Sequence, residues 1–252
     1  MVKKVTTVID NFDTICLEDS GKVKFLKRCD YKFVTNIEKL CEILDYIKED
    51  YFVMTIKEAK IQDYRTTYFD TDDNYFYICH HNQRNNRFKV RKREYVNTGE
   101  HFLEIKRKTL NGRTTKKRIN SFTETDEQVT IDENVFIKKY IQNELEGLSP
   151  KLDTNFKRLT LVSKKFDERV TVDLGLKFKE YENNTDYQTN NLCIIEVKCN
   201  KMCGKTSILN ALKKFNVRLG GFSKYCIGRA VLNKTLKQNN FKVKVNLLRK
   251  FS

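Results

Sequence analysis

Charged and apolar residues alternate along much of the chain, most clearly in residues 87–109. Within 87–93 every second side chain is basic, Tyr95 continues the series, and Phe88 and Val90 stand between the basic residues. A β-strand sends alternate side chains to opposite faces, so one face of this strand is cationic. Residues 101–109 repeat the pattern after the turn-forming stretch 96–100, which predicts an antiparallel hairpin. The side chains on its charged face are Arg87, Lys89, Arg91, Arg93, Glu104, Lys106 and Lys108.

The same alternation recurs later in the chain. Arg158, Arg169 and Lys198 each alternate with apolar neighbours such as Leu159, Val170 and Val197. One hairpin of this kind is typical of an ordinary sheet with one solvated face. Several of them favour an α+β fold in which an antiparallel β-barrel forms a tunnel and the helices pack outside. So many cations cannot be enclosed dry, so we expect a water-filled tunnel that binds a polyanion.

The remaining pattern predicts further elements. Apolar residues at helical spacing predict helices over 37–49, 130–148 and 206–215, and another helix that begins near residue 222. Short strands are expected over 29–34, 64–70 and 192–198, and a short helix after Asp72 ends at His80 and His81. The last twenty residues read as a final alternating segment. Residues 1–26 show little periodicity and are expected to form a loosely attached arm or an expendable strand, which leaves 27–252 as a single domain.

Composition narrows the class of partner. The 252 residues carry 49 Lys and Arg against 33 Asp and Glu, a net charge of +16. Such a charge favours nucleic acid, an anionic membrane or polyphosphate as a partner. No apolar run approaches the ~18 residues of a membrane span, and no signal-peptide pattern follows Met1. We therefore expect a cytoplasmic protein, either free or peripheral at the inner face of the membrane.

Candidate chemistry lies mainly in the acidic residues among the basic strands. Glu196 lies on a charged strand face and is either a ligand for Mg²⁺ or Mn²⁺ or part of an ion pair. Glu104 and Asp173 are expected to orient neighbouring cations. Gly204-Lys205-Thr206 lacks the earlier glycine of a phosphate-binding loop and reads as a helix start. Cys199 and Cys203 have no second close pair, so no zinc site is expected.

Taken in order, the motifs resemble those of the VTC domain, the polyphosphate polymerase branch of the triphosphate tunnel metalloenzymes. The resemblance runs from about residue 28 to residue 230 and rests on these stretches: Tyr31-Lys32-Phe33, residues 65–71, residues 89–95, residues 102–106, Phe156-Lys157-Arg158, residues 169–173, residues 195–198 and residues 222–225. It implies transfer of the γ-phosphate of ATP to a growing polyphosphate chain inside the tunnel, with Mn²⁺ or Mg²⁺. It is similar to a standalone bacterial version, without the regulatory region and membrane tail of fungal subunits.

The resemblance also implies roles for single residues. Glu196 would hold the metal ion. The basic residues that would bind phosphate are Lys32, Lys89, Arg91, Arg93, Lys106, Arg158, Arg169, Lys198 and Lys224. Of these, Lys89 and Lys198 are included because they lie on the charged strand faces. Catalysis would depend on Arg91, Arg93, Arg158 and Lys224. Glu94 and Phe156 depart from the family pattern, so contacts with adenine or phosphate are expected to differ there.

Two other functions stay open. The tunnel could hydrolyse inorganic triphosphate, since water can replace the phosphate acceptor. The N-terminal ExExK signature of the hydrolytic tunnel enzymes is absent, which disfavours adenylate cyclase or thiamine triphosphatase activity. Alternatively, the chain could be a non-enzymatic binder of polyanions or nucleic acid, although it has no motif for sequence-specific recognition. The sequence leaves open whether a membrane protein receives the polymer.

Overall fold

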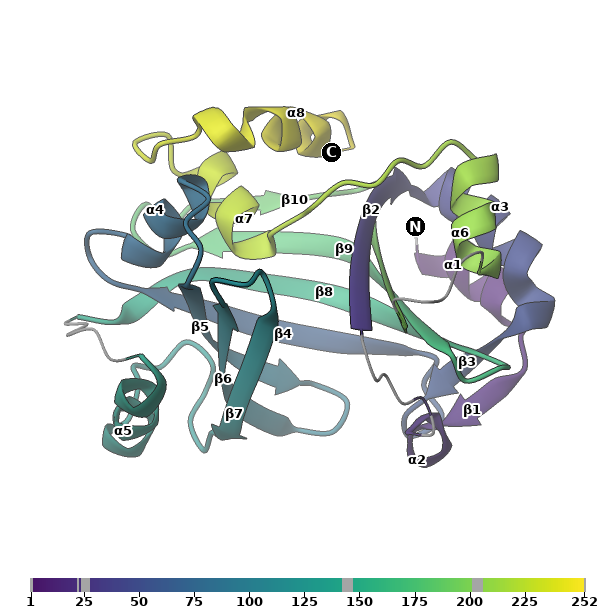
Figure 1. The fold of residues 1–252 in the computed structure, drawn as a ribbon, viewed down its shortest axis with the longest axis horizontal. Helices are drawn as coiled ribbons and strands as arrows, with labels where there is room; N and C mark the ends of the chain where they lie inside the picture. Colours follow the sequence, from purple (N-terminus) through teal and green to yellow (C-terminus); the bar gives the residue numbers. More distant parts are fainter. Residues whose placement is uncertain (1, 22, 24–27, 142–146, 201–205, 252) are drawn as a thin grey trace.

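A computed structural model describes residues 2–21, 23, 28–141, 147–200 and 206–251 (Figure 1). Over these ranges the chain forms an 11-stranded sheet whose main path runs β2-β11-β9-β8-β4-β5-β6-β7. Pairing is antiparallel except between β1 and β3. The strands are β1 Thr14–Cys16, β2 Arg28–Asn36, β3 Tyr51–Thr55, β4 Ile61–Asp70, β5 Arg87–Tyr95, β6 Glu100–Lys108, β7 Thr114–Asn120, β8 Ser149–Ser163, β9 Glu168–Glu180, β10 Asp186–Gln188 and β11 Leu192–Asn200.

The helices of the described residues pack against this sheet. They are α1 Val2–Ile9, α2 Leu17–Ser20, α3 Ile37–Ile47, α4 Tyr75–His81, α5 Ile131–Tyr140, α6 Ser207–Lys214, α7 Lys224–Leu232 and α8 Lys242–Lys250, with short 3-10 helices η1 Lys48–Asp50 and η2 Asn239–Phe241. None of them is long and apolar enough to cross a bilayer.

One apolar core lies between the outer face of the sheet and helices α1, α3 and α6. Leu40 and Leu44 of α3 are buried against Val172 of β9 and Ile195 of β11. These strand residues are the apolar members of the alternating pattern. Their charged neighbours therefore lie on the opposite, inner face of the sheet.

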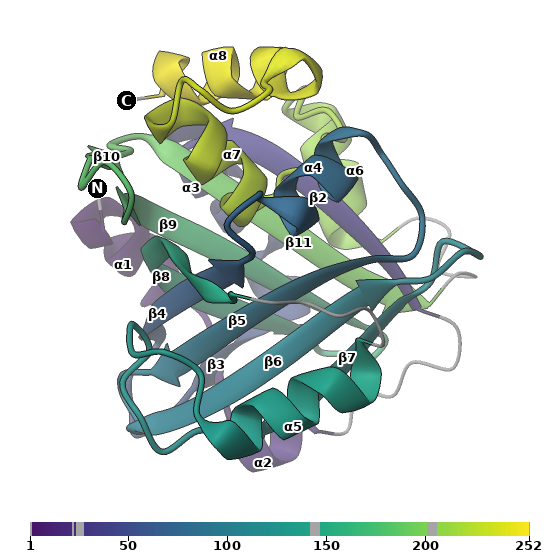
Figure 2. The ribbon, with the colours of Figure 1, turned by 90° about the vertical axis from the view of Figure 1, so that its left-hand side faces the viewer.

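A second apolar core covers the outer face of the β5–β6 hairpin (Figure 2). Val90, Leu103 and Ile105 pack there with Phe76 of α4 and Ile137 of α5. The hairpin register pairs Arg91 with Glu104 and Lys89 with Lys106. This confirms the predicted hairpin and the sorting of its side chains into an apolar face and a charged face.

Helix α7 covers one end of the inner face. The pairing of β8 with β9 shifts near Gly175, which has a positive φ of 58°. Beyond this irregularity Leu176 and Phe178 pack with Leu152 of β8 against α7. A Cβ atom on Gly228 of α7 would lie 2.6 Å from Phe178, so only glycine permits this close approach.

The inner face is curved, although the hydrogen bonding of the described strands does not close it. Strands β2 and β7 end the path of the sheet and do not pair with each other in the described ranges. Lys32 of β2 and Thr114 of β7 nevertheless line the same cavity. The two ends of the sheet therefore face each other, and the predicted antiparallel barrel-like tunnel with outer helices is confirmed.

Some predicted elements were wrong. Residues 2–9 are a helix whose Val5 and Ile9 are fully buried in the first core, so the expected loose arm is packed there. The last residues form helix α8, because Phe241, Val245 and Leu248 are buried at helical spacing while Val243 is exposed. Helix α5 ends at Tyr140, earlier than expected, and residues 142–146 of that prediction lie outside the described residues.

The polar stretch 182–191 contains the short strand β10, which pairs with β9. Residues 201–205 lie outside the described residues, and with them Cys203, Gly204 and Lys205 of the motifs considered above. Helix α6 begins as predicted, because the side chain of Thr206 accepts a hydrogen bond from the backbone nitrogen of Leu209.

Candidate functional site

The inner face of the curved sheet, which we call the lumen face, gathers charged side chains from six strands and one helix. Those on the strands lie at positions that alternate with residues of an outer core, except Arg93, whose neighbours are Lys92 and Glu94. They come from β2, β11, β9, β8, β5, β6 and α7 and are Lys32, Glu196, Lys198, Arg169, Asp173, Arg158, Lys89, Arg91, Arg93, Glu104, Lys106 and Lys224. All the residues predicted for the site therefore lie on this face.

Arg91 is fixed by a buried carboxylate. Its Nε donates to Oε2 of Glu104 at 2.7 Å, and Lys116 of β7 pairs with Oε1 of the same carboxylate at 2.5 Å. The Glu104 side chain is 0% exposed and that of Arg91 is 7% exposed. Burial raises the pKa of Glu104, but the charges of Arg91 and Arg93 outweigh it and hold that pKa below its ordinary value. Glu104 thus stays ionised and orients two cations.

A second carboxylate fixes Arg158 and Lys224. Arg158 holds Asp173 in a two-pronged ion pair, with Nε to Oδ1 at 2.6 Å and Nη2 to Oδ2 at 2.8 Å. Lys224, at the start of α7, pairs with the same Oδ2 and lies 4.3 Å from the centre of the Phe156 ring. Burial opposes ionisation of Asp173, yet Arg158 and Lys224 lower its pKa. A helix and two strands are joined by this carboxylate.

Glu196, the predicted metal ligand, lies between two lysines. Its Oε1 is 2.5 Å from Nζ of Lys32, and its Oε2 is 3.2 Å from Nζ of Lys198. Burial raises its pKa, but Lys198, Lys32 and Arg158 hold that pKa well below its ordinary value, so the carboxylate is ionised. The described residues contain no cluster of three or more His, Cys, Asp or Glu side chains that could hold a metal by themselves. One carboxylate fits a Mg²⁺ or Mn²⁺ whose remaining ligands are water and substrate phosphates.

Two other lumen cations, the buried Arg93 and the half-buried Lys106, have no carboxylate within ion-pair distance in the described residues. Arg93 donates to Oγ1 of Thr66 at 3.1 Å and stacks 5.4 Å from the Tyr64 ring. For Lys106 the charge of Arg91, burial and the charge of Arg93 together lower the pKa well below its ordinary value. These cations face the lumen without a protein counter-charge.

Two cavities lie along the lumen face. The first, of about 380 Å³, is lined by Lys32, Lys89 and Lys106, together with residues of α7 and α8. The second, of about 640 Å³, has a mixed lining that includes Asp63, Glu100 and several apolar residues. Its basic and aromatic side chains are Arg118, Arg158, Arg169, Lys198, Tyr64, Tyr95 and Phe102. Along β5, Arg91 and Arg93 lie between Lys89 of the first cavity and Tyr95 of the second. The cations thus follow a path from one cavity to the other.

Arg169 differs from the other predicted residues. It lines the second cavity, but its Nη2 donates to the backbone carbonyl of Ser20 at 2.7 Å. The Arg169 guanidinium is therefore partly engaged in holding α2 against the sheet. Burial lowers its pKa, and its Nε has no hydrogen-bond partner in the described part of the chain.

Three lumen residues were absent from the predicted set. Lys116 pairs with Glu104, Arg118 lies 4.3 Å from the ring of Phe102, and the hydroxyl of Tyr68 accepts a hydrogen bond from Arg91 at 3.4 Å. The alternation of Lys116 and Arg118 with Lys117 and Ile119 could have placed the first two on the lumen face. No pattern in the sequence singles out Tyr68.

Comparison with known proteins agrees with this geometry. A family model described as the VTC domain matches residues 27–233, which span every strand from β2 to β11. The chain belongs to the VTC domain family. The resemblance inferred from the ordered motifs is thereby confirmed, and helix α8 lies beyond the part of this VTC chain that matches.

Solved structures align with the chain at low identity. A candidate adenylate cyclase from Bacillus halodurans aligns with a TM-score of 0.51 and 14% identity, over 78% of the VTC chain and 94% of the other chain. A candidate adenylyl cyclase from Hippeastrum, described as having a dominant triphosphatase activity, aligns with a TM-score of 0.46 and 11% identity, over 81% and 96% of the two chains. The comparison with curated proteins gives no match.

Proposed function

We propose that this VTC domain is a polyphosphate polymerase, which transfers the γ-phosphoryl group of ATP to the end of a polyphosphate chain in the tunnel. The observation that carries the proposal is the set of lumen cations without a protein counter-charge, above all the buried Arg93 and the half-buried Lys106. Buried cations of this kind are expensive unless an anion neutralises them. A chain of phosphates supplies one negative charge after another along the path between the two cavities.

Phosphoryl transfer depends mainly on positioning and on neutralising charge. Arg91 and Arg158 are held by Glu104 and Asp173 before substrate binds, so they need little reorganisation when charge develops on the transferring group. Lys224 is held by the same Asp173 and approaches from α7. The acceptor is an ionised terminal phosphate, so no general base is required.

Glu196, with phosphate oxygens of the substrate, would hold the Mn²⁺ or Mg²⁺. The ion, when bound, adds positive charge where the phosphate chain is most negative. Without the ion, Lys32 and Lys198 neutralise the Glu196 carboxylate. When the carboxylate binds the ion, the two lysines would contact phosphate.

The test is a product assay with purified protein, ATP and Mn²⁺, with and without a short polyphosphate primer, resolved on a gel. We expect a ladder of polyphosphate from the wild type and none from Glu196→Gln. Arg113→Met, which alters an exposed arginine of the β6–β7 turn, is the matched control and should leave the ladder unchanged. Release of orthophosphate alone would indicate a triphosphatase, and absence of any turnover with primer and metal would contradict the proposal.

A further inference from the structure

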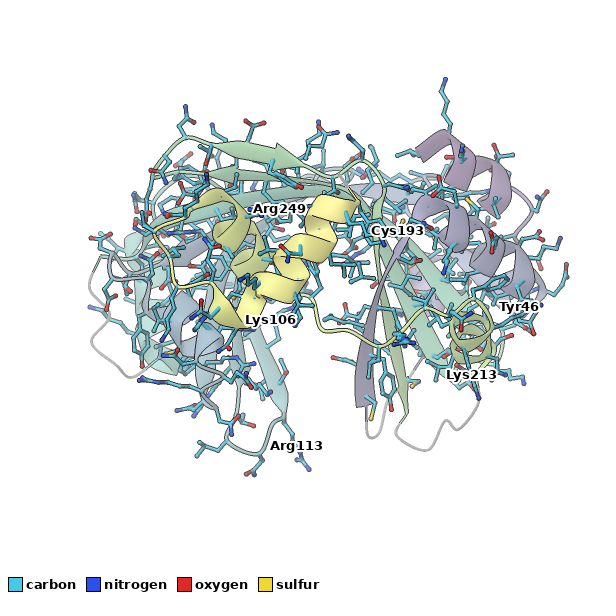
Figure 3. The ribbon with its side chains drawn as sticks, turned by 90° about the horizontal axis from the view of Figure 1, so that it is seen from above. Tyr46, Lys106, Arg113, Cys193, Lys213 and Arg249 are labelled. Atoms are coloured by element: carbon cyan, nitrogen blue, oxygen red, sulfur yellow. The ribbon has the colours of Figure 1, made fainter. Side chains whose placement is uncertain are left out.

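His80, at the end of α4, lies in the most basic part of the tunnel. It lines the first cavity, where the lining residues of the described chain include no carboxylate. Basic residues of four different elements share that lining: Lys32, Arg87, Lys89, Lys106, Lys108 and Lys244. In Figure 3 Lys106 is labelled beside the C-terminal helices, whose residues Ile227 and Lys244 line the same cavity.

The ring nitrogens of His80 and His81 differ in their hydrogen-bond partners. Nδ1 of His81 meets Oδ1 of Asn82 at 3.0 Å, and its Nε2 accepts a hydrogen bond from the backbone of Asn240 at 3.2 Å. His81 is thus a structural helix end, as predicted. The Nδ1 atom of His80 is buried and has no partner in the described residues, and its ring packs 5.9 Å from that of Phe241.

The electrostatic surroundings keep His80 neutral when the cavity holds no anion. Burial lowers its pKa to about 2, with further contributions from the positive charges of Lys89, Arg87, Lys244 and Lys108. A phosphate chain between these cations would reverse the sign of the local field, because an opposite charge nearby favours the protonated imidazole. His80 is thus neutral in the empty cavity and gains a positive charge when an anion favours its protonation.

We propose that His80 takes up a proton from solvent when a chain of unesterified phosphates enters the first cavity, and then donates a hydrogen bond to a phosphate oxygen. The imidazole becomes an imidazolium, and no other bond changes. The charged and titratable groups that face it are those of β5, β6, α8 and β2: Arg87, Lys89, Lys106, Lys108, Lys244 and Lys32. The inference rests on the proposed function only in requiring that the tunnel binds phosphate chains, and it requires no transfer reaction.

Proton uptake on binding has a definite sign. Because the complex holds one proton more than the free protein at His80, the affinity for tripolyphosphate rises as pH falls. Lysines of lowered pKa on the same face, such as Lys89 and Lys106, would also take up protons on binding. Only a difference between the wild type and a His80 variant isolates the histidine.

The chain contains three histidines, so each imidazole can be followed by NMR after selective ¹³C labelling. Spectra are recorded between about pH 5 and 8, where an unperturbed histidine changes charge, without metal and with or without saturating tripolyphosphate. We expect the His80 signal to be that of neutral imidazole in the free protein and to titrate within this range in the complex. A His80 signal that stays neutral in the saturated complex would overturn the inference. Potassium chloride at matched ionic strength is the control.

A calorimetric comparison separates this inference from the proposed function. Binding of tripolyphosphate at pH 6 and 8 is measured for the wild type, His80→Gln and Arg113→Met. We expect His80→Gln to bind more weakly than the wild type at pH 6 and to show a smaller change in affinity with pH, while Arg113→Met follows the wild type. Equal pH dependence in His80→Gln and the wild type would refute the role of His80 and leave the tunnel site standing. Failure of the wild type to bind would refute both.

Discussion

At the scale of single residues, neighbouring lumen cations have different surroundings. Arg91 and Arg93 point to the same face of β5, yet Arg91 is paired with the buried Glu104 whereas Arg93 contacts a hydroxyl and aromatic rings. Removing Arg91 leaves a buried carboxylate with Lys116 as its remaining partner. Removing Arg93 leaves no such charge. The two arginines should therefore differ in their effect on stability although both face the substrate path.

We expect Arg91→Met to lower the free energy of unfolding by about 3 kcal/mol, because breaking a buried ion pair strands its partner. Arg93→Met should lower it by much less. The double variant Arg91→Met, Glu104→Gln should recover most of the stability and none of the phosphate binding. Urea unfolding and tripolyphosphate titration measure the two quantities. Equal stability of the two single variants would contradict this account of Glu104.

The depressed pKa of Asp173 predicts how stability depends on pH. Since its folded pKa lies below the ordinary value of about 3.9, the ion pairs stabilise the fold above that pH and are lost as pH falls toward the folded pKa. We expect the free energy of unfolding of the wild type to fall between about pH 5 and pH 2. Asp173→Asn should be less stable at pH 7 and should show a shallower fall. Parallel curves would mean that Asp173 carries no such linkage.

At the scale of elements, helix α1 contributes to the core beside α3. Ile9→Ala should cost about 2–4 kcal/mol of stability, because it opens a cavity at a fully buried position. Val243→Ala in α8 is a control, since that side chain is 83% exposed and the change should stay within about 0.5 kcal/mol. Urea unfolding of both variants is the measurement. A neutral Ile9→Ala would restore the idea of a loose N-terminal arm.

The elements also show what the sequence could predict. Alternation placed the charged residues of the hairpin and of β8, β9 and β11 on one face, because each strand buries its apolar set against helices. A stretch of six or seven residues cannot separate a period of two from one of 3.6, so the residues of α8 were interpreted as an alternating segment and not as a helix. The shift near Gly175, which turns the apolar side chains of β9 toward α7, depends on tertiary pairing and left no local signal.

The placement of the site residues could be predicted more completely than the helices and strands around them. The predicted phosphate-binding residues of the strands lie on the lumen face, since strand periodicity decides that placement. Lys224 reaches the same face from the start of helix α7. The ion-pair partners of these residues could not be predicted from the sequence. The contact of Lys224 with Asp173, for example, joins a helix to a strand 51 positions away. The engagement of Arg169 by Ser20 is likewise a tertiary contact, across 149 positions. The roles of these residues in binding and catalysis stay predictions.

At the scale of the whole molecule, the net charge of +16 is divided between the lumen and the outer surface. Exposed basic residues such as Lys117, Lys138 and Arg113 attract any polyanion, and salt screens that attraction strongly. The lumen cations are buried or half-buried, and some of them, such as Arg91 and Arg158, are also held by internal carboxylates. They should therefore bind a phosphate chain with less sensitivity to salt. Binding that depends on the lumen separates a tunnel enzyme from a surface binder of nucleic acid.

The most direct measurement is the affinity for tripolyphosphate of the wild type, Arg93→Met and Arg113→Met at low and at physiological salt. Each variant removes one arginine. Arg93 faces the lumen from β5, and Arg113 lies in the β6–β7 turn, where Figure 3 labels it. The account predicts at least a tenfold loss for Arg93→Met at both salt concentrations, about 1.4 kcal/mol, and little change for Arg113→Met. Equal losses for the two variants, or binding by Arg93→Met as tight as by the wild type, would contradict it.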